Sequence, residues 1–210
     1  METIKRIINL GSNCIGTDWI NSIKLREKSP VDNFAEFRLS SSVNLFNGKI
    51  NNYILNNQYI KRKSTLEEKQ KYFFRNEIFI FPEGFSIVHN DFESRKFRKE
   101  FKKRIRIFNR FCKKAKNNNS FWFIYSLSKE DENLSLEDIN RLKNGLPKYV
   151  SDKLICLGIR GNNPGFKNVF KYYYAINKEE DFSWHDKDQA FSIVQYFETT
   201  YKLKFFRNKK

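Results

Sequence analysis

The sequence predicts an α/β fold, a single three-layer domain over residues 1–210 with a mostly parallel sheet. Short apolar runs of strand length alternate with longer helix-like stretches, which is the pattern of βαβ units covered by helices on both faces. The length of 210 residues suits one domain. The 22 Phe, 10 Tyr and 3 Trp can fill a sizeable core, which excludes a disordered chain.

The first expected strand and helix flank a short polar turn. Residues 4–10 are largely apolar, and Gly11-Ser12-Asn13 ends the run. A helical stretch follows over residues 14–25. This strand–turn–helix order is how a βαβ unit begins.

The next part of the chain is less regular. Residues 27–76 show no clear period, and we expect a helical or irregular insertion there, with one helix over residues 64–74 and Ser64 as its N-cap. Residues 77–81 and 85–89 are then expected as strands around a Pro-Glu-Gly turn.

Residues 92–116 form the clearest expected helix. Its apolar side chains recur at three- and four-residue steps, namely Phe97, Phe101, Ile105, Phe108, Phe111, Cys112 and Ala115. Its other faces carry twelve basic side chains between Arg95 and Lys116 and the single acid Glu100. We expect the apolar stripe to pack on the sheet and the charges to face solvent.

The remaining elements complete the alternation. Strands are expected over residues 121–127, 153–159 and 169–176, and helices over residues 134–146, with Ser135 as N-cap, and 186–201. Residues 203–210 are expected to form a flexible basic tail.

The amino-acid composition limits the classes of function that this chain can have. The net charge of +16 is compatible with nucleic acid, an anionic membrane face or acidic substrates. Alternatively, the charge has no functional cause. The chain is rich in Lys, Asn, Ile, Phe and Tyr, which is the bias of an AT-rich genome, and Lys then accumulates on the surface without a binding partner. No apolar run reaches 18 residues, so no membrane span is expected.

The cysteines indicate the compartment. Cys14, Cys112 and Cys156 are too far apart for a disulfide framework or a zinc site, and the N-terminus lacks the features of a signal peptide. We expect a cytoplasmic protein in a reducing environment. No cofactor or metal is expected, because no glycine-rich phosphate loop and no paired metal-ligand spacing occurs.

Candidate site residues follow expected strands, where α/β sheets form their sites. The three stretches are residues 11–14, 89–91 and 125–128. Cys14 begins a helix, where the helix dipole and free N–H groups favour the thiolate. Gly11, Ser12 and Asn13 could bind an oxyanion there. The alternative is a buried structural cysteine in the first helical turn.

His89 is the candidate base for that thiol. Its tautomer would be held by Asp91, with Asp32 and Asn90 as alternatives. A competing role for Asp91 is N-cap of the long basic helix.

Two further functional hypotheses stay open. Serine hydrolases of the SGNH type carry a serine after the first strand and an Asp-x-x-His motif before the last helix. Ser12 and His185 match this arrangement only loosely, because Asp181 lies four residues before the histidine. Alternatively, the basic helix over residues 95–116 binds nucleic acid or another polyanion without catalysis, with Arg104 and Arg106 as anion-binding residues.

Several short motifs, in order, resemble a family of microbial proteins described as papain-like cysteine peptidases. They are Leu10-Gly11-Ser12-Asn13-Cys14, Pro30-Val31-Asp32-Asn33-Phe34, Val88-His89-Asn90-Asp91, Lys102-Lys103-Arg104-Ile105-Arg106-Ile107-Phe108 and Phe123-Ile124-Tyr125. Tyr125 stands where the family has arginine, and the second motif lacks the family's Phe and Trp. The resemblance covers about residues 4–127.

The resemblance implies a Cys14 nucleophile, His89 as its base, and an acidic or amide residue that completes the set. It also implies the papain architecture of a helical lobe beside an antiparallel β lobe, whereas the alternation of elements favours a parallel sheet. The expected activity is a peptidase or related cysteine-dependent hydrolase or transferase. Its substrate would be a peptide, a glycan or another acyl compound, and weak polyanion binding is a further expectation.

Overall fold

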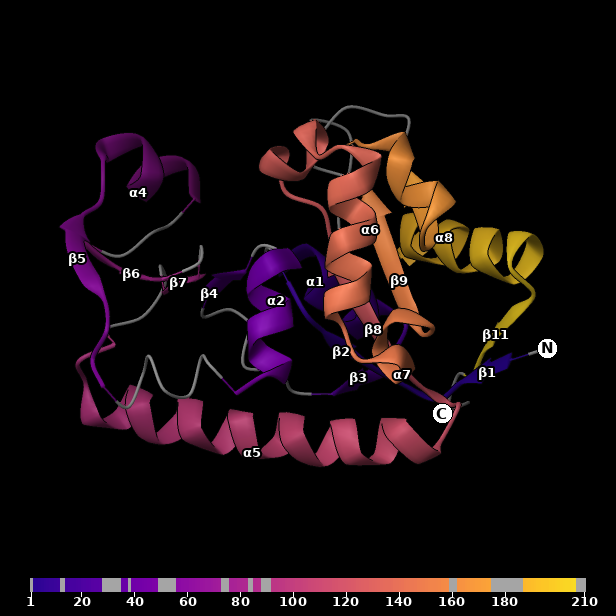
Figure 1. Ribbon diagram of the computed structural model, residues 1–210, viewed down its shortest axis with the longest axis horizontal. Helices are drawn as coiled ribbons and strands as arrows, with labels where there is room; N and C mark the ends of the chain where they lie inside the picture. The colour runs from indigo at the N-terminus through magenta and orange to yellow at the C-terminus, as the bar shows by residue number, and fades with distance from the viewer. Residues whose placement is uncertain are drawn as a thin grey trace.

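The computed structural model describes residues 2–11, 14–27, 35–37, 39–48, 56–72, 76–82, 85–87, 92–158, 162–174 and 187–206. Its larger sheet is parallel throughout, with the strand order β10-β9-β8-β2-β3 among the described residues (Figure 1). The strands are β2 (Arg6–Asn9), β3 (Arg26–Glu27), β8 (Phe121–Ser126), β9 (Leu154–Gly158) and β10 (Lys171–Tyr174). This confirms the α/β class and the parallel sheet.

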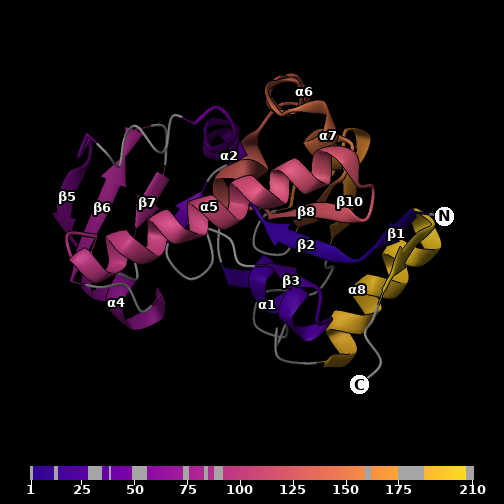
Figure 2. The same ribbon diagram turned by 90° about the horizontal axis from the view of Figure 1, so that it is seen from below.

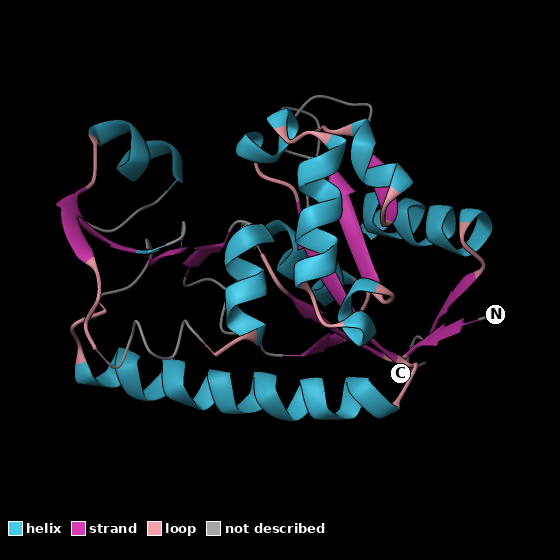
Figure 3. Ribbon diagram, viewed as in Figure 1, coloured by secondary structure: helices cyan, strands magenta, loops and turns pink. Residues whose placement is uncertain are grey.

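Helices cover both faces of this sheet, so the expected three layers are confirmed (Figure 3). Along β8, Trp122 and Ile124 face one layer, which contains α1 (Cys14–Ser22) and α8 (Lys187–Thr200). Phe123 and Tyr125 face the other layer, which contains α2 (Leu39–Phe46), α5 (Arg95–Asn117), α6 (Leu136–Gly145) and α7 (Lys148–Ser151). The period of two along a buried strand separates the two cores.

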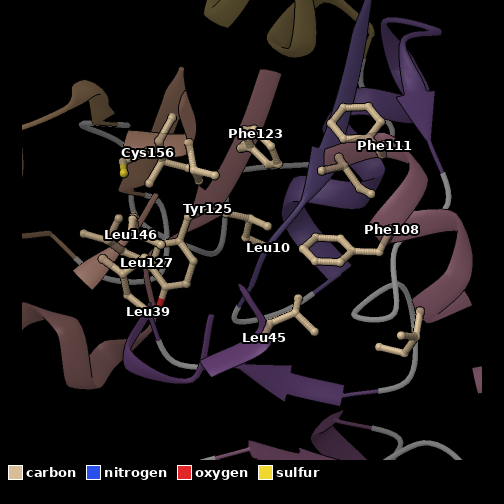
Figure 4. Packing of buried hydrophobic residues seen from close by; sticks show 14 of the residues in the cluster. Leu10, Leu39, Leu45, Phe108, Phe111, Phe123, Tyr125, Leu127, Leu146 and Cys156 are labelled. Atoms are coloured by element: carbon tan, nitrogen blue, oxygen red, sulfur yellow. The ribbon is translucent and has the colours of Figure 1, made fainter. Parts of the chain in front are cut away.

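The core on the α5 side is dominated by aromatic rings. Figure 4 shows Phe108 and Phe111 of α5 beside Phe123 of β8, with Tyr125 and Cys156 farther along the sheet. The ring centroids of Phe111 and Phe123 are 5.5 Å apart in an edge-to-face arrangement, which aromatic pairs prefer. Cys156 is fully buried, as a small apolar side chain would be.

The insertion differs from the expectation. Besides α2 and α4 (Leu66–Tyr72), residues 27–76 contain β4 and β5, which join β6 and β7 in an antiparallel sheet with the order β4-β7-β6-β5. Its strands are β4 (Ala35–Phe37), β5 (Ile60–Lys63), β6 (Glu77–Phe81) and β7 (Phe85–Ile87). Strands β6 and β7 were expected from the sequence, but they join this sheet and not the parallel one. Periodicity shows that a strand has a buried face and does not show which sheet it joins.

The helix α5 passes under both sheets (Figures 1 and 2). Its N-terminal half packs through Phe97 and Phe101 beside Phe92, which itself contacts Phe79 and Phe81 of β6. Its C-terminal half packs against the parallel sheet. The helix begins after Ser94, whose side chain accepts a hydrogen bond from the Phe97 N–H at 3.1 Å. The N-cap is therefore Ser94 and not Asp91.

Several element ends also differ from expectation. Thr65, and not Ser64, caps α4, because it exchanges hydrogen bonds with Glu68 in a capping box. Ser135 caps α6 as expected. Residues 203–205 of the expected tail form β11 (Leu203–Phe205), which pairs in parallel with β1 (Glu2–Ile4). Its buried Leu203 and Phe205 stabilise this end of the chain. Two 3₁₀ turns, η2 (Lys129–Asn133) and η3 (Pro164–Asn168), follow β8 and β9.

Among the residues that the structure describes, no helix is both long and apolar enough to cross a membrane.

Candidate functional site

The order of the parallel strands marks a candidate site beside the first helix. Across the sheet the parallel strands lie in the order β3-β2-β8-β9-β10. The strand that comes second in the chain, β3, lies at the edge beside the first strand, β2, and the later strands follow on the other side of β2. The order therefore reverses between β2 and β8. In doubly wound sheets of this flavodoxin-like order, ligands bind at that reversal, beyond the carboxyl ends of the strands. The helix α1, which follows β2, begins there.

Buried hydrogen bonds hold the turn between β2 and α1. The Asn9 side chain donates from Nδ2 to Thr17 Oγ1 at 2.9 Å, and its Oδ1 accepts from the Gly11 N–H at 3.0 Å. Asn9 and Thr17 are fully buried. A buried amide is stable only when it is hydrogen-bonded, so Asn9 fixes the strand end, the turn and the helix relative to one another.

The first turn of α1 lies unusually close to the two strand ends. A Cβ at Gly16 would lie 2.9 Å from Ser126 Oγ and 3.0 Å from Asn9 Oδ1. A larger residue at this position would have to displace the Ser126 or Asn9 side chain. Cys14, two residues earlier, is the first residue of α1. The backbone around Cys14 is therefore held at the reversal point by contacts from both strands.

The antiparallel sheet is tied to the same edge. Ser42 of α2 donates a 2.7 Å hydrogen bond to the Leu10 carbonyl oxygen, and β4 directly precedes α2. Strands β4 and β7 pair through Ala35 and Ile87. Strand β4 therefore begins beside the end of β7.

The helix α8 is also tied to α1. Trp19 Nε1 donates to the Ala190 carbonyl oxygen at 3.2 Å, and the Trp19 ring packs on Phe197. This contact brings the first turn of α8 against α1. His185 precedes α8 by two residues.

A second buried polar group lies after β8 and β9. Asp131 Oδ2 accepts hydrogen bonds from Tyr125 OH at 2.6 Å, from the Ser128 N–H at 2.7 Å and from the Ser128 hydroxyl at 2.9 Å. Burial, and secondarily the Asp131 charge, raises the pKa of Tyr125 well above its usual value. Asn163 donates from Nδ2 to the carbonyl oxygens of Asp131 and Leu134. These bonds fix the loops after β8 and β9.

The predicted site residues are described only in part. Gly11 and the backbone of Cys14 belong to the described structure, and Gly11 is buried. The other residues predicted for the cysteine and serine sites lie outside the described residues, namely Ser12, Asn13, Asp32, His89, Asn90, Asp91, Asp181 and His185.

Arg104 and Arg106 are separated from Cys14. They belong to α5, which covers the opposite face of the parallel sheet from α1. Arg104 pairs with Glu100 at 3.2 Å, and Arg106 is exposed. The parallel sheet therefore lies between the basic helix and α1.

Sequence reasoning missed Asn9, Thr17 and Asp131. A polar side chain inside an apolar strand, as Asn9 is, was the available signal, because such a group must find a buried partner. Thr17 and Asp131 gave no comparable signal.

No group of three or more His, Cys, Asp or Glu side chains that could hold a metal gathers within the described ranges. No family model matches this chain, and neither the curated proteins nor the solved structures contain a match to it.

Proposed function

We propose that this protein is a cysteine-dependent hydrolase or acyl transferase with Cys14 as its nucleophile. The observation that carries the proposal is the position of Cys14 as the first residue of α1, directly after β2, where the strand order reverses. Helix N-termini lower thiol pKa values, because the dipole and the free N–H groups stabilise the thiolate.

The reaction would proceed in two steps. The Cys14 thiolate attacks the carbonyl carbon of an acyl substrate, and N–H groups at the start of α1 stabilise the oxyanion. The leaving group departs with a proton from a histidine, and a thioester remains on Cys14. Water or another nucleophile then attacks the thioester, gives its proton to the histidine and releases the thiolate. The substrate class would be a peptide, a glycan ester or amide, or another acyl compound.

The base would be one of the two histidines of the chain. His89 is the candidate that the family resemblance supports. His185, two residues before α8 in the sequence, is the alternative.

Thiol reactivity tests the nucleophile. Cys112 and Cys156 are internal controls, because burial raises the pKa of Cys112 to about 12 and that of Cys156 well above its usual value. Iodoacetamide labelling from pH 5 to 9, followed by peptide mass spectrometry, should show Cys14 reacting first and at lower pH than the other two cysteines. Labelling of Cys14 no faster than Cys112 would reject the proposal.

Substitutions then assign the roles. Cys14→Ala should abolish hydrolysis of activated esters and thioesters, and Ser12→Ala should retain it. His185→Asn and His89→Asn, measured separately, identify the base through the loss of the corresponding pKa from the pH–rate profile. Loss of activity in Ser12→Ala with full activity in Cys14→Ala would replace this proposal with the serine hydrolase alternative.

A further inference from the structure

The positive charge of the chain is concentrated on one helix. The α5 segment contains twelve basic residues and one acidic residue, a net of +11 out of the +16 of the whole chain. An even distribution of the 40 basic residues over 210 positions would place four or five on a helix of this length. Compositional bias enriches Lys along the whole chain, so it does not account for this concentration.

The tertiary structure leaves these charges on the outside. The apolar residues Phe97, Phe101, Ile105, Phe108 and Phe111 are all buried, so the apolar side of α5 is used entirely in the core. Ten of the twelve basic side chains are exposed. The acid Glu100 pairs with Arg104 at 3.2 Å and lies 3.9 Å from Lys103, so it offsets one of the twelve positive charges. In Figure 2 the outer side of α5 faces the viewer, in front of both sheets.

We propose that this outer face of α5 binds the phosphate backbone of a double-stranded nucleic acid without sequence preference. Its outermost cations recur at steps of three or four residues, namely Arg95, Lys99, Lys103, Arg106, Arg110 and Lys113. These steps place a positive charge about every 5–6 Å along the helix. The 23 residues of α5 extend over roughly 34 Å, about the length of one duplex turn.

The surface fits a duplex better than a single strand or a membrane. Single-strand binding needs exposed aromatic rings on which bases stack, and the four phenylalanines of α5 are buried. An interfacial membrane helix must insert its apolar face, which is covered here by the two sheets. Backbone phosphates need only cations along a rigid element, and α5 provides these.

Salt dependence tests the binding. Fluorescence anisotropy of a 20-base-pair mixed-sequence DNA duplex, with a matching RNA duplex and a single strand, is measured from 50 to 200 mM NaCl. Six phosphate contacts predict a slope of about −5 in log K against log salt, which is about a thousandfold loss of affinity over this range. The single strand should bind more weakly than either duplex.

Substitutions locate the surface. Lys99→Gln, Arg106→Gln and Arg110→Gln together should flatten the salt slope by about 3, because three phosphate contacts are lost. The matched control replaces three exposed cations outside α5 by glutamine, at Lys129, Lys167 and Lys204. It removes the same net charge and should change the slope by less than one. Circular dichroism melts verify that both variants are folded.

Three results would overturn the proposal. An affinity that does not change between the two salt concentrations would exclude phosphate contacts. Equal losses of duplex affinity in the α5 variant and in the control variant would show that net charge alone is responsible for binding. Binding to vesicles containing one-third phosphatidylserine, with no binding to either duplex, would assign the surface to membranes instead.

Discussion

The two sheets of this protein differ in how deeply they are buried. In the parallel sheet every residue of β9 is buried, and so is every residue of β8 after Phe121, because helices cover both faces. In the antiparallel sheet the inner strand β6 keeps two half-buried residues, and every residue of the edge strand β5 is exposed. The parallel sheet can therefore hold buried polar groups such as Asn9 in fixed positions. The antiparallel sheet is connected to the parallel sheet through α5 and through α2, which follows β4.

Charges protect the exposed edge of the antiparallel sheet. Lys61 of β5 forms ion pairs with Glu77 at 3.0 Å and with Glu93 at 2.9 Å, and Arg62 pairs with Glu68 at 2.6 Å. Charged edge strands discourage pairing with another chain. One aromatic-rich chain therefore forms both a covered parallel sheet and an exposed antiparallel sheet. We expect the parallel sheet to be the more stable of the two, because helices cover both of its faces.

The largest expected effect separates the two regions by stability. Phe123→Ala removes a ring that is fully buried between Phe46, Phe111 and Tyr149. It should lower the free energy of unfolding by about 3–5 kcal/mol, through lost burial and the remaining cavity. Urea denaturation followed by circular dichroism measures it.

The matching substitution in the antiparallel sheet is Phe79→Ala, because Phe79 is as fully buried as Phe123. We expect hydrogen exchange to accelerate in β5 and β6 while β8 and β9 stay protected, because the exposed sheet opens by itself. Equal acceleration in both sheets would show that α5 couples them into one cooperative unit.

A smaller effect tests the close approach at the candidate site. Gly16→Ala places a methyl group against Ser126 and Asn9, and should cost about 1–3 kcal/mol of stability by overpacking. Ser126→Ala in the same chain should recover part of this loss, because one of the two close contacts is removed. A double-mutant cycle from thermal melts measures the coupling, and strict additivity would contradict the contact.

Lys153 joins α5 to the parallel sheet. Its ammonium donates to the carbonyl oxygens of Ala115 at 2.6 Å and Asn118 at 3.1 Å at the end of the helix, and burial lowers its pKa. Lys153→Met should cost about 1–2 kcal/mol, because these carbonyls lose a charged donor. Lys148→Met, at an exposed lysine of α7, is the control and should change stability by about 0.5 kcal/mol or less.

The smallest effect concerns the exterior of the antiparallel sheet. Arg62, and secondarily hydrogen bonds from Thr65, lower the pKa of Glu68 to about 2. A lowered pKa in the folded state gives stability that is present above the usual glutamate pKa and is lost as pH falls towards 2. Glu68→Gln should therefore cost about 1 kcal/mol or less at pH 7, since the pair is partly solvated. The difference from the unsubstituted protein should shrink as the pH falls through 2 and vanish below it, as thermal melts would show.

Prediction from the sequence succeeded where one element determines its own structure. The expected helix over residues 92–116 corresponds to α5 because its apolar residues define one face without reference to a partner. The same reasoning found β8, β9 and the Ser135 cap of α6. It missed the capping role of Ser94, because both Asp91 and Ser94 are good N-caps and only the backbone path selects between them.

The candidate site was found only in part. Cys14 at the junction of a strand and a helix was visible in the sequence, because a glycine-containing turn separates the two patterns. The hydrogen bonds of Asn9 and the close approach of Gly16 depend on which strands are neighbours, and β8 lies more than a hundred residues from β2. Local patterns do not contain that information.

The sequence by itself therefore determined the α/β class, the amphipathic basic helix and the position of Cys14 at a helix start. The tertiary structure decided that β6 and β7 form a separate antiparallel sheet, and that α5 lies on the opposite face of the parallel sheet from Cys14. The physical reason is that side-chain periodicity records which face of an element is buried. Which other element buries that face is settled only when distant segments pack together.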